Sequence, residues 1–427
     1  MRTKILAITL GCSKNTVDTQ HLLGSLPADK FEIVGPDYGA YVDFLLVNTC
    51  GFIGDAKEES VEVILDCVER KNEGLVGKLV VFGCLSQRYS GELPAEIPEV
   101  DAWFGARDIL PVIKYICPEA VSCCGRLYDG ASYAYLKISE GCDRRCSYCA
   151  IPFIRGAHKS VPIEDLVREA GQLASKGVKE LILIAQDTTY YGLDLYGRRA
   201  LAELLRALSG VRGIEWLRIH YSYPADFPED VLDEMASNPK VCKYLDIPLQ
   251  HVSDSVLEKM HRHVDGEWTR KLIRKLRDKV PGVVLRTTMI VGHPGESDDD
   301  FCELVNFLRT ARFERLGAFR YSEEEGTWGA KNLPDDVPVE VKDERYEVLM
   351  ETQSDISLAY NISRVGKIEK VLVDSVMDGK LVCRSQYESP EVDGEISVPA
   401  AEGIAPGDFI TVRIVSADYY DLCAEIV

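Results

Sequence analysis

The sequence predicts a multidomain α/β protein that ends in a small antiparallel β-barrel. Apolar runs of strand length alternate with helical patterns through most of the chain, which is typical of parallel sheets. After about residue 364 the pattern changes to short β-branched runs with Gly and Asp turns, which is typical of a small barrel. The 427 residues also exceed the usual size of one hydrophobic core, so we expect two or three domains.

The first segment, residues 1–125, repeats one pattern three times. Each apolar run leads into a short turn that carries one cysteine, Cys12, Cys50 or Cys84. The runs are Ile5–Leu10, Val42–Val47 and Leu79–Phe82, and the helical stretches after the first two are Thr16–Leu26 and Ala56–Arg70. We expect a parallel-sheet α/β domain, in which the loops after the carboxyl ends of the strands gather at one edge. The three cysteines should therefore converge in space.

The second segment, residues 130–360, shows six strand-like runs separated by helical patterns. The strands are expected at Tyr133–Ser139, Leu181–Ala185, Trp216–His220, Tyr244–Ile247, Val283–Val291 and Leu316–Tyr321. The helices are expected at Ile163–Lys176, Ala200–Leu208, Pro228–Ala236, Thr269–Lys279 and Asp299–Arg312. A repeated β-then-α unit that closes into a full or partial (β/α)6 barrel explains this pattern, with the active site at the carboxyl ends of the strands. A doubly wound open sheet is the alternative.

A charged helix around Val339–Asn361 precedes the third segment, residues 364–427. Its strands are expected at Lys370–Ser375, Leu381–Arg384, Glu395–Val398 and Phe409–Val415, which suits a barrel of about five strands. The segment carries 6 Lys and Arg but 12 Asp and Glu. A module that grips RNA should be basic, so this acidic barrel favours a basic protein partner. The alternative is that its carboxylates only form a solvated surface.

The sharpest feature lies directly after the first expected barrel strand, where Cys142, Cys146 and Cys149 follow the spacing CxxxCxxC. Thiolates are the soft ligands of iron–sulfur clusters, and a full cluster needs four of them. Three cysteines therefore leave one iron open, and an open iron can bind a substrate-like molecule. The alternatives are a zinc site completed by His158 and three unligated core cysteines.

This loop resembles the radical S-adenosylmethionine superfamily. The resemblance implies that the three cysteines bind a 4Fe–4S cluster whose fourth iron holds the amino and carboxylate groups of S-adenosylmethionine. Reductive cleavage of that molecule yields a 5′-deoxyadenosyl radical, which abstracts hydrogen from an unreactive C–H bond. The protein then has to position the cofactor and exclude water.

Three further stretches are similar to that superfamily. An aromatic residue precedes the third cysteine, and Gln-Asp ends the second expected strand, where many members carry a Gly-Gly-Glu that grips the methionine amino group. The turn Val291–Glu296 resembles a glycine-rich turn that supports the cofactor. The resemblance implies cofactor-binding roles for Tyr148, Gln186, Asp187, Gly292 and Glu296. It implies no catalytic residue beyond the cluster ligands, and strand-end capping is the alternative for each polar residue.

Cys12, Cys50 and Cys84 are the expected ligands of a second open cluster. Together with the barrel and a TRAM-like terminal module, they make the chain resemble the methylthiotransferase family over essentially its whole length. The resemblance implies two 4Fe–4S clusters, two S-adenosylmethionine molecules and an electron donor such as a flavodoxin or ferredoxin. The second cluster would supply or activate sulfur, a second S-adenosylmethionine would donate the methyl group, and C–H would become C–S–CH₃.

Within that family the sequence resembles the branch that modifies a ribosomal protein. Gly11–Asn15 reads Gly-Cys-Ser-Lys-Asn, whereas tRNA-modifying enzymes usually carry Gln-Met after the cysteine. Leu136–Cys142 and Ser385–Gly394 match the same branch. The resemblance implies methylthiolation of the β-carbon of an aspartate in small-subunit ribosomal protein S-twelve. A tRNA adenosine methylthiotransferase and a non-catalytic iron–sulfur electron carrier are the alternatives.

Composition and the first residues favour a cytoplasmic location. No apolar run is long enough to span a membrane, and the first residues lack the features of a signal peptide. The 14 cysteines are therefore expected in a reducing compartment, where ligation is more common than disulfide formation. The net charge of −20 opposes non-specific binding to phosphate backbones. Core packing is expected for Cys67, Cys242, Cys302, Cys383 and Cys423, and redox sensitivity is a minor hypothesis for Cys123 and Cys124.

Overall fold

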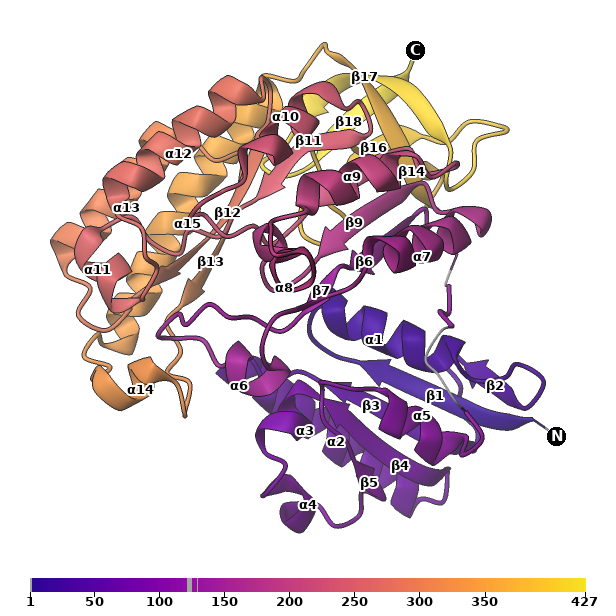
Figure 1. Cartoon of the computed structure of the whole chain (residues 1–427). Helices are drawn as coiled ribbons and strands as arrows, with labels where there is room; N and C mark the ends of the chain where they lie inside the picture. The colour runs from indigo at the N-terminus through magenta and orange to yellow at the C-terminus, as the bar shows by residue number, and fades with distance from the viewer. Residues whose placement is uncertain (1, 121–124, 129) are drawn as a thin grey trace.

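The computed structural model describes residues 2–120, 125–128 and 130–427. These residues form a five-stranded sheet, a six-stranded sheet, a closed five-stranded barrel and a two-stranded sheet. Figure 1 shows the N-terminal sheet at one end of the molecule, the closed barrel at the other and the six-stranded sheet between them. The predicted fold class is therefore confirmed. The Cys123–Cys124 pair lies outside the described residues.

The N-terminal sheet is parallel, with the strand order β2-β1-β3-β4-β5. Its elements are β1 (Thr3–Thr9), α1 (Ser13–Gly24), β2 (Phe31–Val34), β3 (Val42–Thr49), α2 (Gly54–Asn72), β4 (Val76–Gly83), α3 (Cys84–Arg88), α4 (Leu93–Glu96), β5 (Ala102–Trp103) and α5 (Leu110–Ile116). The order reverses between β1 and β3, and doubly wound sheets bind ligands beyond the carboxyl ends of the strands at such a reversal. The short strands β2 and β5 were not predicted, because neither stands out as an apolar run.

The central sheet is also parallel, and its order β13-β12-β11-β10-β9-β6 follows the sequence. Its strands are β6 (Tyr133–Lys137), β9 (Glu180–Ile184), β10 (Trp216–Ile219), β11 (Val241–Asp246), β12 (Val284–Val291) and β13 (Arg315–Arg320). In a (β/α) barrel the strands follow one another in sequence order, whereas in a doubly wound sheet the strand order reverses at one point. The doubly wound alternative is therefore wrong. In the pairing of described residues β6 and β13 do not meet, so the barrel is partial.

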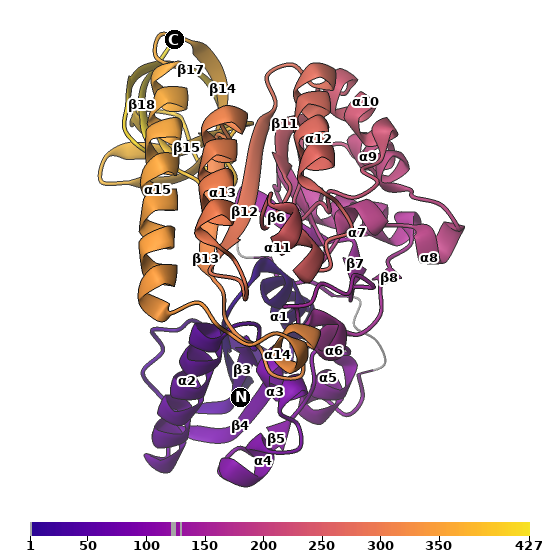
Figure 2. The same ribbon diagram turned by 90° about the vertical axis from the view of Figure 1, so that its left-hand side faces the viewer.

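Helices and short strands connect the barrel strands. They are β7 (Ser139–Glu140), α6 (Ile151–Arg155), β8 (Lys159–Ser160), α7 (Ile163–Ser175), a 3-10 turn η1 (Thr188–Tyr190), α8 (Leu193–Tyr196), α9 (Leu201–Ser209), α10 (Glu229–Ser237), α11 (Asp254–Lys259), α12 (Gly266–Lys279), α13 (Asp298–Ala311), α14 (Trp328–Asn332) and α15 (Val339–Ile362). Figure 2 shows α12, α13 and α15 side by side along one flank of the sheet. The long charged helix expected before the terminal module is α15, and it packs on β13 and α13.

Side chains alternate between the two faces of the barrel sheet. Leu181 and Leu183 of β9 belong to the large core that the barrel sheet shares with its helices. Ile182 points to the opposite, inner face, where it packs with Tyr135 of β6 and with Val17 of α1. Helix α1 of the N-terminal domain therefore covers part of the inner face of the barrel (Figure 1).

The C-terminal barrel closes in the order β14-β15-β16-β18-β17. Its strands are β14 (Ile368–Met377), β15 (Lys380–Ser385), β16 (Ile396–Pro399), β17 (Phe409–Ala417) and β18 (Leu422–Ile426). Four of its pairings are antiparallel, as expected, but β16 and β18 run parallel. Leu372 and Phe409 of this barrel pack against Trp216 and Val284, the first residues of β10 and β12. The module therefore sits at the amino ends of the central strands.

Buried ion pairs join the terminal barrel to the central sheet. The carboxylate of Glu180, the first residue of β9, lies 2.6 Å from Arg218 Nε and 2.9 Å from Arg384 Nη1, and all three side chains are at most 2% exposed. Burial opposes ionisation of Glu180, but the two guanidinium groups hold its pKa below the usual range. Removing one partner of such a set leaves a buried charge uncompensated, so the loss of any member should weaken the docking of the two parts.

A second buried set lies at the start of the β15–β16 loop. Glu388 pairs with Arg364 and, at 3.2 Å, with Arg315 of β13, and it accepts a hydrogen bond from Ser385 Oγ at 2.7 Å. Burial opposes ionisation of Glu388, but Arg364 and Arg315 lower its pKa to about 2. This loop is therefore fastened to both the module and the barrel strands.

The remaining cysteines divide between core and surface. Cys67, Cys242 and Cys383 are buried, which confirms their expected packing role. The same prediction is wrong for Cys302 and Cys423, which are exposed. Cys302 lies on the solvent side of α13, and Cys423 falls between two buried positions of β18, where alternation points it outward. Among the described residues, no helix is both long and apolar enough to cross a membrane.

Replacing Glu388 by Gln should lower the free energy of unfolding by about 3 kcal/mol at pH 7. The folded-state pKa is depressed, so this contribution is complete above the unfolded-state pKa of about 4.3 and is lost as the pH falls toward 2. Urea unfolding of the metal-free chain at several pH values measures the difference. Glu402→Gln, an exposed change in the same module, is the control and should have little effect at any pH. Equal effects of the two changes would contradict the prediction.

Candidate functional site

The first cysteine triad lies at the carboxyl edge of the N-terminal sheet. Cys12 precedes α1, Cys50 follows β3 directly, and Cys84 begins α3 directly after β4. Strands β1, β3 and β4 are neighbours, so the structure brings these three residues together. A methyl group on Gly11 would come within 2.8 Å of Cys50 Sγ, so only glycine allows this close approach. Burial raises the pKa of Cys84 to about 11, and the charges of Cys12 and Cys50 add to the shift.

The second triad lies in the loop between β7 and α6, at the carboxyl end of the first barrel strand. Cys142, Cys146 and Cys149 are all partly buried. Burial raises the pKa of Cys142 to about 12, and a charge on Cys146 raises it further. Burial and the other two thiols also raise the pKa of Cys149. The three sulfur atoms are thus close enough to interact electrostatically.

Each triad is in contact with one buried arginine. Arg155 Nε lies 3.2 Å from Cys84 Sγ, and Arg262 Nη1 lies 3.7 Å from Cys146 Sγ. A thiol must lose its proton to ligate a metal, and a neighbouring guanidinium stabilises the resulting thiolate. The donor set therefore suits metal ligation, although burial alone would keep these thiols protonated.

In the part of the chain that the structure describes, no three Cys, His, Asp or Glu side chains converge closely enough to hold a single metal ion. His158, the local candidate for a zinc ligand, instead has its Nε2 atom 3.0 Å from Ser160 Oγ. Ligands of one zinc ion all lie about 2 Å from it, whereas the thiolates of a cluster bind different irons. Two spread triads are therefore compatible with clusters.

A buried network of charges connects the N-terminal triad to the barrel domain. Arg155, at the end of α6, places Nη1 2.7 Å from Asp18 of α1 and 3.1 Å from Glu140 of β7, and Nη2 donates to Asn15. Lys137 of β6 pairs with the same two carboxylates. Burial opposes ionisation of Glu140, but Lys137 and Arg155 lower its pKa to about 2. Arg155 thus contacts Cys84 of the first triad, although in sequence it lies in the helix directly after the second triad.

The network was not among the predicted site residues. A charged residue inside a buried strand is the available signal, because such residues are rarely buried without a partner. Lys137 ends the otherwise apolar run Tyr133–Lys137, so it carried that signal. Asp18 and Arg155 carried no such signal, since Asp18 is paired only by residues of the other domain and Arg155 is paired in part by them.

Of the residues with an implied cofactor role, Tyr148, Gln186 and Asp187 lie close to the barrel triad or its loop. Tyr148 is half-buried, and its burial raises the pKa of the phenol, with the charge of Cys146 adding to the shift. Gln186 Nε2 donates to Glu140 at 2.9 Å, while its buried Oε1 has no partner among the described residues. Asp187 caps η1 by accepting a hydrogen bond from the backbone N–H of Thr189, and it also binds Arg144 at 2.9 Å. The capping role that the sequence offered as the alternative to cofactor binding is therefore present at Asp187.

Gly292 and Glu296 lie against α15. A side chain at Gly292 would approach the Lys342 side chain to 2.3 Å, and Gly292 has a φ of 70°, so the turn requires glycine. Glu296 pairs with Arg345 at 2.9 Å and accepts from the His293 backbone N–H. Burial raises the pKa of Glu296 to about 7, although Arg345 opposes this shift. Their contacts thus brace the turn, and a role toward the cofactor stays a prediction.

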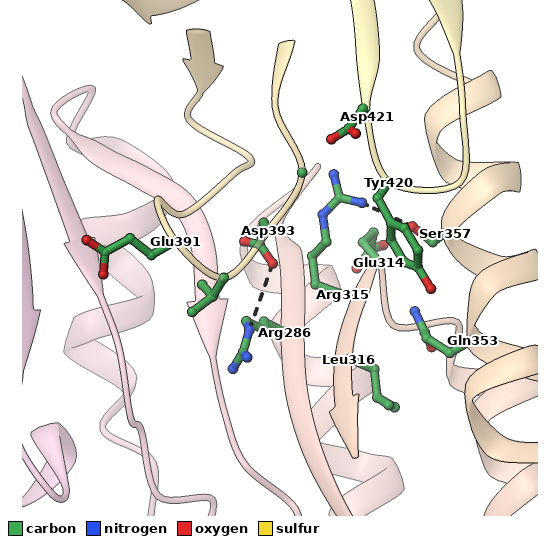
Figure 3. Close-up of a pocket in the computed structure, with 12 residues that line it drawn as sticks. Arg286, Glu314, Arg315, Leu316, Gln353, Ser357, Glu391, Asp393, Tyr420 and Asp421 are labelled. Carbon is green, nitrogen blue, oxygen red and sulfur yellow. Dashed lines mark hydrogen bonds and ion pairs between the residues drawn. The ribbon is translucent and has the colours of Figure 1, made fainter. Parts of the chain in front are cut away.

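A pocket of about 350 Å³ lies at the opposite end of the central sheet. Figure 3 shows it between the first residues of β12 and β13, helix α15 and two loops of the terminal barrel. Residues that line it include Arg286, Arg315, Gln353, Asp393, Tyr420 and Asp421. Arg286 pairs with Asp393, and Arg315 contacts Ser357 of α15, so the pocket belongs to the joint between barrel and module.

Comparison with known proteins covers all three parts of the chain. The matching family models are the radical SAM superfamily at residues 136–308, an uncharacterized protein family, UPF0004, at residues 4–105 and the TRAM domain at residues 365–427. A ribosomal protein uS12 methylthiotransferase RimO from Porphyromonas gingivalis is 48% identical over 431 residues, which cover 100% of this chain and 99% of the relative. The chain belongs to the RimO family. The RimO proteins of Cytophaga hutchinsonii and Bacteroides fragilis are 47% and 46% identical, again over 100% of this chain and 98% and 100% of theirs.

Membership of the RimO family confirms the predicted enzyme class, a radical SAM methylthiotransferase. It also confirms iron–sulfur clusters and S-adenosylmethionine as the cofactors of this class.

Solved structures support the fold. The radical S-adenosylmethionine methyltransferase TsrM from Kitasatospora setae aligns with a TM-score of 0.55 and 14% identity over 75% of this chain and 72% of its own. The radical enzyme OxsB aligns with a TM-score of 0.52 and 13% identity over 82% of this chain and 56% of its own.

Replacing Arg155 by Met should destabilise the metal-free protein by about 3–5 kcal/mol, because Asp18 and Glu140 lose a buried cation. Adding Asp18→Asn to this variant should recover part of the loss, since one of the two carboxylates is then neutral. Anaerobic urea unfolding measures both. Arg413→Met is the control, because its pair with Glu425 is half exposed and should contribute below about 1 kcal/mol. A loss at Arg155 no larger than at Arg413 would refute the network.

Proposed function

We propose that this enzyme adds a methylthio group to the β-carbon of an aspartate in small-subunit ribosomal protein S-twelve, uS12. The observation that carries this proposal is the match along the whole chain to relatives that are named ribosomal protein uS12 methylthiotransferases. The acidic terminal barrel supports it, because a basic ribosomal protein is attracted by complementary charge and RNA is not. A ribosomal substrate also implies a cytoplasmic enzyme.

Three parts of the chain divide the work. Residues 1–125 hold the second cluster through Cys12, Cys50 and Cys84. Residues 130–360 hold the radical-generating cluster through three ligands, Cys142, Cys146 and Cys149. Residues 364–427, the TRAM-like barrel, recognise the protein substrate. The convergence of each triad at the carboxyl edge of its own sheet supports this division.

When bound, the clusters and S-adenosylmethionine supply the electron transfer, hydrogen abstraction and sulfur donation that the protein side chains cannot perform. The protein orients the thiolates and stabilises their charge through Arg155 and Arg262. Val17 of helix α1 packs on apolar residues of the inner face of the barrel, and this contact would limit the access of water there. An external flavodoxin or ferredoxin is the proposed electron donor.

Tyr148, Gln186 and Asp187 are the proposed contacts of S-adenosylmethionine nearest the barrel triad. Two polar atoms there, Gln186 Oε1 and Arg144 Nη2, are buried without a partner among the described residues. An acceptor and a donor left free in this way suit the amino and carboxylate groups of a methionine moiety. Gly292 and Glu296 support the same cofactor by holding the turn after β12.

The test is anaerobic reconstitution with iron and sulfide, reduction, and incubation with S-adenosylmethionine and purified uS12 or tRNA, followed by mass spectrometry. We expect one methylthio group on an aspartyl peptide of uS12 and none on tRNA. Modification of tRNA alone would establish the adenosine-modifying activity instead. Absence of 5′-deoxyadenosine with every substrate would leave only an electron carrier.

Iron content tests the ligand assignment separately. Replacing Cys12, Cys50 and Cys84 by Ala should remove about four irons per chain, and so should replacing Cys142, Cys146 and Cys149. Each variant should keep the other cluster, because the two triads share no ligand. Cys67→Ala, a buried cysteine outside both triads, should keep all the iron. Unchanged iron content in either triple variant would refute the assignment.

A further inference from the structure

Lys14, in the first turn of α1, reaches from the N-terminal domain to the inner face of the barrel. Its ammonium nitrogen lies 3.3 Å from the centre of the Tyr221 ring, and the residue is only 9% exposed. Tyr221 follows β10 at its carboxyl end and packs against Tyr135 and Val17 on that inner face. The Lys14 ammonium is therefore placed between the N-terminal triad and the reactive end of the barrel.

The carboxylate nearest to Lys14 along its own helix already forms ion pairs with other residues. Asp18 lies four residues further along α1, the spacing at which opposite charges usually pair. Its carboxylate instead binds Lys137 and Arg155. In the described part of the chain Lys14 forms no ion pair, and its ammonium lies over the Tyr221 ring.

A carboxylate of the barrel next to Tyr221 also has partners already. Asp246, the last residue of β11, binds Arg286 at 3.0 Å and accepts the backbone N–H of Tyr221 at 3.0 Å. The neighbouring imidazole of His220 offers no compensating charge, because burial lowers its pKa to about 3 and the charge of Lys14 contributes to that shift. Lys14 is thus a buried cation that no carboxylate of the described residues pairs with.

A buried charge without a counter-charge is costly, and a cation–π contact offsets only part of that cost. An anionic ligand would complete the arrangement. The target of the proposed reaction supplies one, because the β-carbon of an aspartate is bonded directly to the carboxyl group. Holding that carboxylate also fixes the position of the reacting carbon, one bond away.

We propose that Lys14 binds the carboxylate of the target aspartyl side chain and determines the specificity for aspartate. This inference rests on the proposed function. The chemistry that Lys14 recognises is a carboxylate, and S-adenosylmethionine also carries one. The experiment therefore has to separate the protein substrate from the cofactor.

The experiment compares uS12 with a uS12 variant in which the target Asp is replaced by Asn, using the reconstituted holoenzyme. We expect Lys14→Gln to lower kcat/KM for the Asp substrate about 10- to 100-fold, because a charged hydrogen bond is lost. The activity ratio between the Asp and Asn substrates should fall by the same factor. A merely structural role would lower both activities and leave their ratio unchanged, and that result would overturn the proposal.

Three controls complete the design. Lys14→Arg keeps the positive charge and should retain the preference for Asp, and loss of that preference would overturn the proposal in favour of packing. Lys78→Gln removes a lysine of the same domain that also lies near aromatic rings, but on the exposed side of β4, and should leave the ratio unchanged. Iron content shows that each variant carries both clusters.

Binding of S-adenosylmethionine by equilibrium dialysis, without uS12, separates the two carboxylate sources. We expect the same Kd for wild type and Lys14→Gln. A Kd raised about 10-fold or more, with the Asp-to-Asn ratio unchanged, would assign Lys14 to the cofactor and overturn the proposal. If the wild-type enzyme modifies neither uS12 nor its variant, the proposed function itself fails, and the inference falls with it.

Discussion

The docking of α1 on the inner face of the barrel is the contact on which the rest of the structure depends. It joins the domain that carries the first triad to the barrel that carries the second, through charges as well as apolar side chains. Arg155 and Lys137 of the barrel domain face Asp18 of α1 in a buried set that also includes Glu140. Glu140 supplies one negative charge for the two barrel cations and Asp18 of α1 supplies the other, so separating the domains would leave an excess positive charge on the barrel and an unpaired carboxylate on α1.

The fold and the cysteine positions could be predicted because both depend on local patterns. Alternating apolar runs revealed the strands, and a cysteine directly after a strand must lie at the carboxyl edge of a parallel sheet. The partners of those cysteines could not be predicted in this way. Arg155 contacts Cys84 across 71 positions of the sequence, and nothing in its own neighbourhood indicates that contact. Asp18 likewise lies on an ordinary helical surface until the barrel covers it.

The elements that were missed or misjudged share a physical cause. Strands β2, β5 and β18 are short, and their apolar content does not stand out from the turns around them. Cys302 and Cys423 were expected in the core because their segments are apolar, but burial follows the face of the element. The parallel pairing of β16 with β18 depends on how the closed barrel connects its ends, which no single segment encodes.

The terminal barrel and the two triads occupy opposite ends of the central strands. Strand β12 has eight residues and is therefore about 26 Å long. A protein bound to the terminal barrel would need a segment that spans this length for one of its residues to reach the thiols. A flat surface cannot do this, whereas a protruding loop or hairpin can. If the terminal barrel holds the protein substrate, as proposed, the distance of the target residue from the bound surface would contribute to its selection as well as the chemistry of its side chain.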